Sequence, residues 1–163
     1  MDINFKPFEE KHREGVIDIL NYYIKMTTAA FREDIVDYTH FDKIIDKNDV
    51  YSGYAITASG EEIVGFCTLE PFKNIRSFKK TAEAMYFIKK EYIGKGIGKR
   101  ALQRLENDAK EIGISKIIVD ITDDNENSIR FHERNGFIEY GRLKKCWNKF
   151  GRDLGIVYME KDI

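Results

Sequence analysis

The sequence predicts a mixed α/β fold, with one sheet of six or seven strands and helices on both faces. Three observations support this fold class. Apolar residues recur at helical spacing over 12–26 and 97–112. Runs rich in β-branched and aromatic residues, bounded by turn residues, recur between and after these helices. The strand-helix-strand order over 82–122 requires two parallel strands beside otherwise antiparallel ones. At 163 residues, the chain has the size of a single domain, 1–163.

The first half of the chain supplies two helices and three strands. The alternating segment INFKPF at 3–8 predicts a short strand, and Val16, Ile17, Leu20 and Ile24 place an apolar stripe on the helix 12–26. The segment 37–46 predicts a second short helix with an Asp or Thr at its start. Residues 53–72 read as two strands joined by a Ser-Gly turn.

The second half contains the strand-helix-strand unit. We expect a strand over 82–93, a helix over 97–112 that Gly113 ends, and a strand over 116–122. The segment KIIVDIT at 116–122 is almost entirely apolar, which is typical of a strand covered on both faces. A short helix within 125–137 closes at Gly136, and the last strands are 137–143 and 154–160.

Composition excludes several classes of function. Apolar residues make up 42% and charged residues 34%, with a net charge of −1, which argues against nucleic acid or an anionic membrane as partner. No apolar run approaches the length of a membrane span, and the first residues lack a signal-like segment, so we expect a cytoplasmic protein. Cys67 and Cys146, and His12, His40 and His132, form no ligand cluster, so we predict no metal site.

The glycine-rich segment GKGIGKR at 94–100 indicates a site for a negatively charged ligand. A P-loop is excluded because no Gly-Lys-Ser/Thr follows. A dinucleotide fingerprint does match at Gly96, Gly98 and Ala101, with Asp120 at a strand end about 20 residues on. Against it, charged residues precede the loop, and only one strand-helix unit follows. Free amide groups at a helix start would equally suit a pyrophosphate, and a turn without any ligand remains an alternative.

Four segments in this order resemble one family. They are NYYIKMTTAAF at 21–31, TAEAMYFIKKEYIGKGIGKRAL at 81–102, NENSIRFHERNGF at 125–137 and KFGRDLGIVYME at 149–160. Together they resemble the GCN5-related N-acetyltransferase (GNAT) superfamily, and within it the phosphinothricin acetyltransferase-like branch. The resemblance implies a GNAT fold whose sheet is splayed to admit acetyl-CoA as co-substrate.

The resemblance also implies roles for individual residues. The backbone of Tyr86, Phe87 and Ile88 would pair with pantetheine. Asn125 would bond the pantetheine region, and Arg134 would reach the coenzyme phosphates. From the residues alone, Lys99 and Arg100 could also bind these phosphates, or they could belong to the solvated face of a helix start. The pyrophosphate would be held by the loop residues Gly94, Lys95, Gly96, Ile97, Gly98 and Lys99.

For catalysis, the resemblance assigns the general base to Glu83. Its apolar neighbours Ala82, Ala84 and Met85 would favour a raised carboxyl pKa, although a solvent-facing residue of an amphipathic strand fits the same pattern. His132 is the second catalytic candidate, as an acid, a coenzyme contact or a structural residue.

Phe31 and Lys73 are the predicted acceptor contacts. Ile75 and Phe78 stand where herbicide-acetylating members of the branch have Arg and Tyr for an anionic substrate, so phosphinothricin itself is not predicted as the acceptor.

The sequence therefore predicts an acetyl-CoA-dependent N-acetyltransferase acting on a small amine, including amino-acid-like compounds. A peptide or protein N-terminal acetyltransferase and a non-catalytic acyl-CoA sensor are the alternatives. We also predict a homodimer, because aromatic residues crowd the last strands at Tyr140, Trp147, Phe150 and Tyr158.

Overall fold

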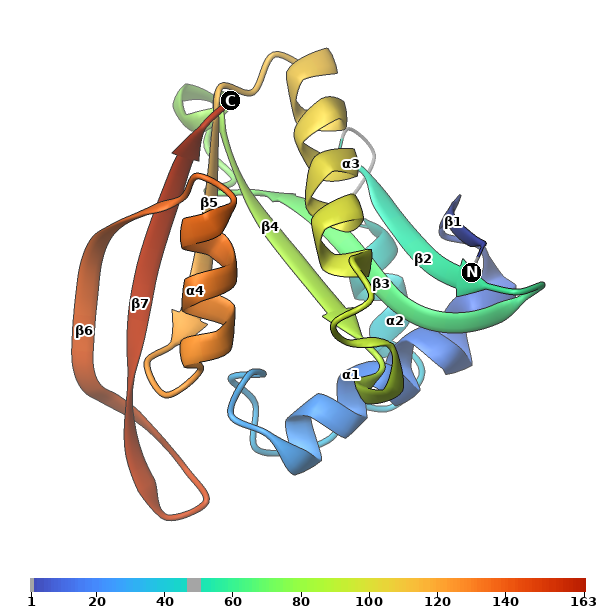
Figure 1. Cartoon of the computed structure of the whole chain (residues 1–163), viewed down its shortest axis with the longest axis horizontal. Coiled ribbons are helices and arrows are strands. Elements are labelled where there is room, and N and C mark those ends of the chain that lie inside the picture. Colours follow the sequence, from blue (N-terminus) through green and yellow to red (C-terminus); the bar gives the residue numbers. More distant parts are fainter. Residues whose placement is uncertain (1, 47–50) are drawn as a thin grey trace.

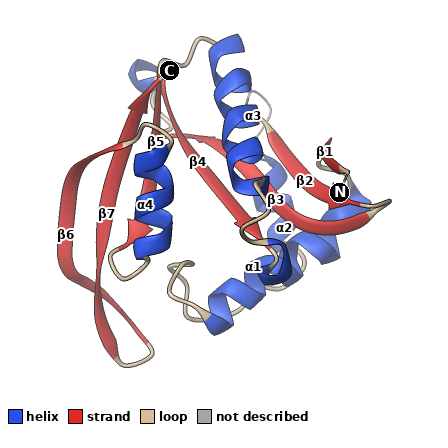
Figure 2. Cartoon of the chain, in the orientation of Figure 1, coloured by secondary structure: helices blue, strands red, loops and turns tan. Residues whose placement is uncertain are grey.

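The computed structural model describes residues 2–46 and 51–163, which form one seven-stranded sheet with the order β1-β2-β3-β4-β5-β7-β6 (Figure 2). The strands are β1 Ile3–Pro7, β2 Gly53–Ala58, β3 Glu62–Pro71, β4 Thr81–Ile88, β5 Lys116–Thr122, β6 Ile138–Lys149 and β7 Arg152–Asp162. The α-helices are α1 Arg13–Met26, α2 His40–Asp46, α3 Ile97–Glu111 and α4 Glu126–Arg134. The predicted mixed sheet is confirmed.

Helices cover both faces of the sheet, as predicted (Figure 1). One buried cluster places α3 against β2, β3, β4 and β5, through residues such as Leu102, Leu105 and Ile117. The other places α1 and α2 against the opposite face, through Ile17, Phe41 and Phe66. The apolar stripes read from the sequence are therefore the surfaces that bury the two faces of the sheet.

The two parallel strands β4 and β5 pair over a short stretch only. Thr81, Ala82 and Glu83 pair with Lys116, Ile117 and Ile118, and the pairing then stops. Figure 1 shows the two strands together at the end near the C-terminus and apart at the other end. The splay predicted from the resemblance is confirmed, and it leaves the backbone of 84–88 without a strand partner on the β5 side.

Alternation along β4 and β5 separates the two sides of this gap. Tyr86 and Ile88 pack on the cluster under α3, while Met85 and Phe87 pack on the cluster under α1. Glu83 shares the parity of Met85 and Phe87 and so faces the α1 side. On β5, Val119 and Ile121 belong to the α3 cluster, which places Asp120 on the α1 side.

The strand expected over 82–93 is wrong in its extent. It ends at Ile88, and a 3-10 turn occupies Lys90–Tyr92. The amide of Lys89 donates to the carbonyl of Val64 at 2.7 Å, the last ladder bond before the chain turns away. The charged run at 89–91 thus marks the turn into the glycine loop. The apolar residues Tyr92 and Ile93, which follow this run, had suggested that the strand continues.

Three other predicted boundaries are also corrected. The helix expected from His12 begins at Arg13, because buried His12 belongs to a 3-10 turn in which its Nδ1 accepts from the Glu9 amide at 3.0 Å. The strands expected at 137–143 and 154–160 extend to meet at a two-residue turn. Phe150 and Gly151 both have positive φ, +54° and +70°, as such hairpin turns require.

Candidate active site

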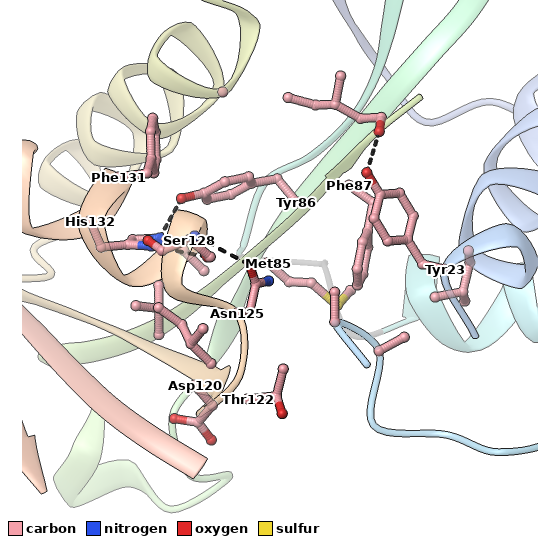
Figure 3. Close-up of a pocket in the computed structure, with 18 of the residues that line it drawn as sticks. Tyr23, Met85, Tyr86, Phe87, Asp120, Thr122, Asn125, Ser128, Phe131 and His132 are labelled. Atoms are coloured by element: carbon pink, nitrogen blue, oxygen red, sulfur yellow. Dashed lines mark hydrogen bonds between the residues drawn. The ribbon is translucent and has the colours of Figure 1, made fainter. Parts of the chain in front are cut away.

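A cavity of about 830 Å³ lies at the gap between β4 and β5 (Figure 3). Its walls come from β4 and β5, from the loop before α3, from α4, and from the segment that joins α1 to α2. Predicted site residues in its lining are Phe31, Glu83, Tyr86, Phe87, Ile88, Gly94, Gly96, Ile97, Gly98, Lys99, Asn125 and His132. Most of the residues singled out from the sequence are therefore brought together in one cavity.

One end of the cavity is the start of α3. Gly94 and Gly96 have φ of +80° and +78°, and a Cβ built on either would meet no heavy atom within 4 Å. In the part of the chain that the structure describes, the amide groups of 94–99 donate no backbone hydrogen bond, and the first helical bond runs from the Arg100 amide to the Gly96 carbonyl. Free amides at the positive end of a helix form a fitting cradle for a pyrophosphate.

Several of the charged side chains that were predicted to meet the phosphates do not reach this cradle. The Nζ of Lys95 sits over the Tyr92 ring at 4.7 Å, outside the cavity lining, and Arg100 donates to the Ile3 carbonyl at 2.8 Å. Arg134 is exposed in the last turn of α4 and does not line the cavity. Of the four cationic side chains predicted to meet phosphates, only Lys99 lines the cavity.

Lys73 is also placed elsewhere. It lines a second cavity of about 600 Å³, with Arg76 and Lys79, and its Nζ lies 5.2 Å from the Phe78 ring centre. Glu70 lines both cavities. The sequence-based role of Lys73 as an acceptor contact therefore has no support in the larger cavity.

On the α3 side of the gap, Tyr86 and His132 form a hydrogen-bonded pair (Figure 3). The Nδ1 of His132 lies 2.8 Å from the Ser128 carbonyl oxygen, which can only accept, so Nδ1 carries the proton. The Nε2 then accepts from the Tyr86 hydroxyl. The Tyr86 oxygen consequently has its lone pairs left for other donors.

Burial fixes the charge state of this pair. It lowers the pKa of His132 to about 4, with the hydrogen bond to Ser128 acting the other way, and it raises the pKa of Tyr86 above its ordinary range. At neutral pH both groups are uncharged. An acid role for His132 would need an imidazolium that this site disfavours, so its geometry fits a residue that orients Tyr86.

Two further polar groups border the gap, Asn125 from α4 and Tyr23 from α1. The Asn125 side-chain oxygen caps α4 by accepting from the Ser128 amide at 3.2 Å, and the NH₂ group is left to donate to a ligand. The Tyr23 hydroxyl donates to the Ile88 carbonyl at 2.5 Å. The predicted pairing of Ile88 with pantetheine would therefore share that carbonyl with Tyr23, because a carbonyl oxygen can accept two hydrogen bonds.

The α1 side of the gap carries carboxylates. Glu70 and Glu83 are direct cross-strand partners on β3 and β4, and Asp120 follows Ile118, the β5 partner of Glu83, by two residues. All three line the cavity on the same face of the sheet. Asp120 was noted in the sequence only as part of a dinucleotide fingerprint, although an acidic residue inside the apolar KIIVDIT segment was the available signal.

The loop after α1 closes this side of the cavity. Phe31 packs edge to face on Trp147 with ring centres 5.1 Å apart, and buried Lys149 donates to the Ala30 carbonyl at 2.8 Å. Thr28 donates to Asp124 at 2.6 Å, and Asp124 also pairs with Arg152 at 2.7 Å. The β6–β7 hairpin thus holds the loop that carries Phe31, a long-range arrangement with no sequence signal.

Comparison with known proteins identifies the family. A family model described as Acetyltransferase (GNAT) family matches residues 16–137. The chain belongs to the GNAT family of acetyltransferases. This confirms the acetyltransferase activity, acetyl-CoA as donor, and the GNAT fold predicted from the resemblance; the dinucleotide interpretation is wrong.

Relatives and solved structures agree with this assignment. An L-methionine sulfoximine/L-methionine sulfone acetyltransferase of Pseudomonas paraeruginosa is 28% identical over 152 residues, covering 91% of this chain and 88% of the relative. A GNAT phosphinothricin acetyltransferase from Sinorhizobium meliloti, solved with AcCoA, has a TM-score of 0.91 at 21% identity, covering 100% of this chain and 89% of that one. A ribosomal-protein-alanine N-acetyltransferase from Brucella melitensis has a TM-score of 0.90 at 26% identity over 100% of both chains.

The lowered pKa of His132 predicts how stability depends on pH. The unfolded chain binds the imidazole proton near the ordinary pKa of 6.5, whereas the folded chain binds it only near 4. The free energy of unfolding should therefore fall as pH decreases from 6.5 to 4, by up to about 3 kcal/mol from this residue. Urea unfolding of wild type and His132→Gln over this range should show that the variant loses this part of the slope.

His12 supplies the matched control, because it is also buried and burial also lowers its pKa. His12→Gln should keep the His132 part of the slope. An NMR titration in which the His132 ring titrates near 6.5 would contradict the buried neutral pair.

Proposed function

We propose that this acetyltransferase acts on the amine of a small, amino-acid-like acceptor, with Glu83 as the general base. The observation that carries the proposal is the gap between β4 and β5. The free amides at the start of α3 lie at one end of this gap, and the carboxylates of the α1 side lie at its closed end. Acetyl-CoA, when bound, supplies a thioester carbonyl for the amine nitrogen and a thiolate as leaving group. The chain itself must bind, orient and deprotonate the acceptor.

The residues divide this work between the two faces of the sheet. On the α3 side, the amides of 96–99 and Lys99 would hold the pyrophosphate, and the unpaired backbone of β4 would hold the pantetheine arm. On the α1 side, Glu83 lies at the last paired position of β4, where the gap opens. A carboxylate there can take the proton that an ammonium group must lose before its nitrogen can attack.

The relatives support a small acceptor and leave a peptide as the second candidate. The Pseudomonas relative is named for amino-acid analogues, whereas the Brucella neighbour is named for an alanine of a ribosomal protein. The β6–β7 hairpin holds the Phe31 loop against the acceptor side, which favours a compact acceptor over an extended chain.

An acceptor panel tests this function. Purified chain, acetyl-CoA and a set of amino acids, amino-acid analogues and a peptide starting with alanine should release free thiol only with small amines, and mass spectrometry should find the acetylated product. Preferential acetylation of the peptide would favour the second candidate. Coenzyme binding without thiol release for any acceptor would instead indicate an acyl-CoA sensor and contradict the proposal.

Glu83→Gln tests the assigned base. Turnover should fall by roughly 10²–10⁴-fold, the usual worth of a positioned base, because the amide keeps the shape but cannot take a proton. The affinity for acetyl-CoA should not change, since its cradle lies elsewhere. Glu70→Gln, at the cross-strand partner of Glu83, is the matched control and should have a far smaller effect. Near-normal turnover of Glu83→Gln at neutral pH would exclude the base role.

We also propose a homodimer that uses the outer strand β6. This strand lies at the sheet edge and exposes Ile138, Tyr140 and Leu143 at 63%, 46% and 50%, with Phe150 beside it at 55%. Trp147 and Tyr158, which contributed to the sequence-based prediction, instead pack on Phe31 and Tyr140. Large apolar side chains exposed together at a sheet edge are normally covered by a partner.

Light scattering at micromolar concentration should give twice the chain mass of 19.1 kDa. Leu143→Asp should return the mass to that of one chain, and Ile112→Asp, at another exposed apolar position after α3, should leave the dimer intact. Wild type at a single-chain mass would refute the dimer.

The described residues contain no helix long and apolar enough to cross a membrane. The cytoplasmic location and the absence of nucleic-acid or membrane partners stay predictions from the sequence.

A further inference from the structure

Asp120 is a carboxylate of the acceptor side that the proposed reaction does not use. It is half-buried on β5, lines the cavity, and is drawn in Figure 3 beside Thr122. No hydrogen bond or ion pair of its side chain occurs within 2–46 and 51–163. Its pKa is raised, and burial is the only cause. A carboxylate held in this way without a partner needs a physical reason.

The neighbouring carboxylate on the same face shows the contrast. Glu160, on β7, pairs with the Nζ of Lys116 at 3.0 Å, and Lys116 pairs with Asp162 as well. Lys116 lies on the same face of β5 as Asp120, but its ammonium group pairs with Glu160 and Asp162 instead. The fold therefore compensates the charge of Glu160 and leaves the charge of Asp120 without a cation.

Two aromatic rings border Asp120. Tyr158 is its direct cross-strand partner on β7, and Tyr140 lies against Tyr158 with ring centres 5.9 Å apart. Burial, and then the charge of Asp120, raises the pKa of both tyrosines. A carboxylate attracts an organic cation by ion pairing, and neighbouring tyrosine rings add cation–π attraction.

The separation between Asp120 and Glu83 sets the shape of the ligand. Asp120 lies two residues beyond the β5 partner of Glu83, which is ~6.6 Å along the strand and ~4.8 Å across it. The two Cα atoms are therefore about 8 Å apart or more, as the strands diverge. Besides burial, the charges of both carboxylates raise the pKa of Tyr140, that of Asp120 more than that of Glu83, which agrees with both lying on the same face of the sheet.

We propose that Asp120 binds a second positively charged group of the acceptor, so that the preferred acceptor is a small amine with two cationic centres, such as a basic amino acid or a diamine. This rests on the proposed function, in which Glu83 receives the reacting amine. The second ammonium group then meets Asp120 from the cavity, with Tyr158 as the cross-strand neighbour of Asp120 and Tyr140 packed on Tyr158.

The test uses acceptors that differ only in the second charge. L-lysine and L-norleucine have the same carbon chain, as do 1,5-diaminopentane and pentylamine. In wild type, kcat/KM should be higher for the dicationic member of each pair, roughly 10- to 100-fold, the usual worth of a hydrogen bond to a charged group. Preference for lysine alone would identify a basic amino acid, and preference within both pairs a diamine-type site.

Asp120→Asn should abolish this preference by raising KM for the dicationic acceptor, with kcat and the kinetics of the monocationic acceptor little changed. Glu160→Gln, on the same face but paired with Lys116, is the control and should keep the preference. Thermal unfolding should show Asp120→Asn as stable as wild type or more stable, because it removes a buried charge without a partner.

The possible failures are distinct. Acetylation of norleucine and lysine at equal rates, or a preference that survives in Asp120→Asn, would overturn this inference and leave the proposed function standing. No acetylation of any amine would overturn both. Calorimetric titration of lysine into the wild-type chain and Asp120→Asn, each with CoA in place of acetyl-CoA, measures binding without turnover, and equal affinities would also overturn the inference.

Discussion

The site depends on one constraint: β4 and β5 pair for three residues and then part. Continuous pairing would bury the backbone of 84–88 in the sheet and close the cavity. Because the strands part, β4 offers unpaired backbone, the free amides at the start of α3 border the same gap, and side chains of opposite parity reach its two sides. The separation of coenzyme side and acceptor side follows from this geometry and from the alternation of a strand.

The core on each face holds the parted strands in place. α3 packs its apolar stripe on β4 and β5 near their junction, and α1 packs on β3 and β4 from the other face. The Tyr86–His132 pair joins β4 to α4, and the Tyr23–Ile88 bond joins β4 to α1. These two hydrogen bonds tie β4 to the helices on either side and leave the gap itself open.

Local pattern was enough to predict much of this arrangement. The glycine spacing at 94–98 and the apolar stripe after it were visible in the sequence, and the structure gives Gly94 and Gly96 the positive φ that only such residues adopt easily. The resemblance to a family added the splay and Glu83. The placement of long charged side chains was not predictable: Lys95, Arg100, Arg134 and Lys73 look alike as basic residues near a phosphate or acceptor, and none of them lines the larger cavity.

Pairings between distant segments were not predictable either. Nothing local indicates that Tyr86 donates to His132, that Lys149 holds the Ala30 carbonyl, or that Lys116 compensates Glu160 and leaves Asp120 alone. Each depends on strand register, which is set by the whole sheet.

The most direct test of the account is a crystal structure of the chain with bound acetyl-CoA. The account predicts pantetheine in the gap between β4 and β5, the pyrophosphate on the amides of 96–99, and the thioester at the level of Glu83. A coenzyme bound outside the gap, or strands that close on each other when it binds, would contradict the account.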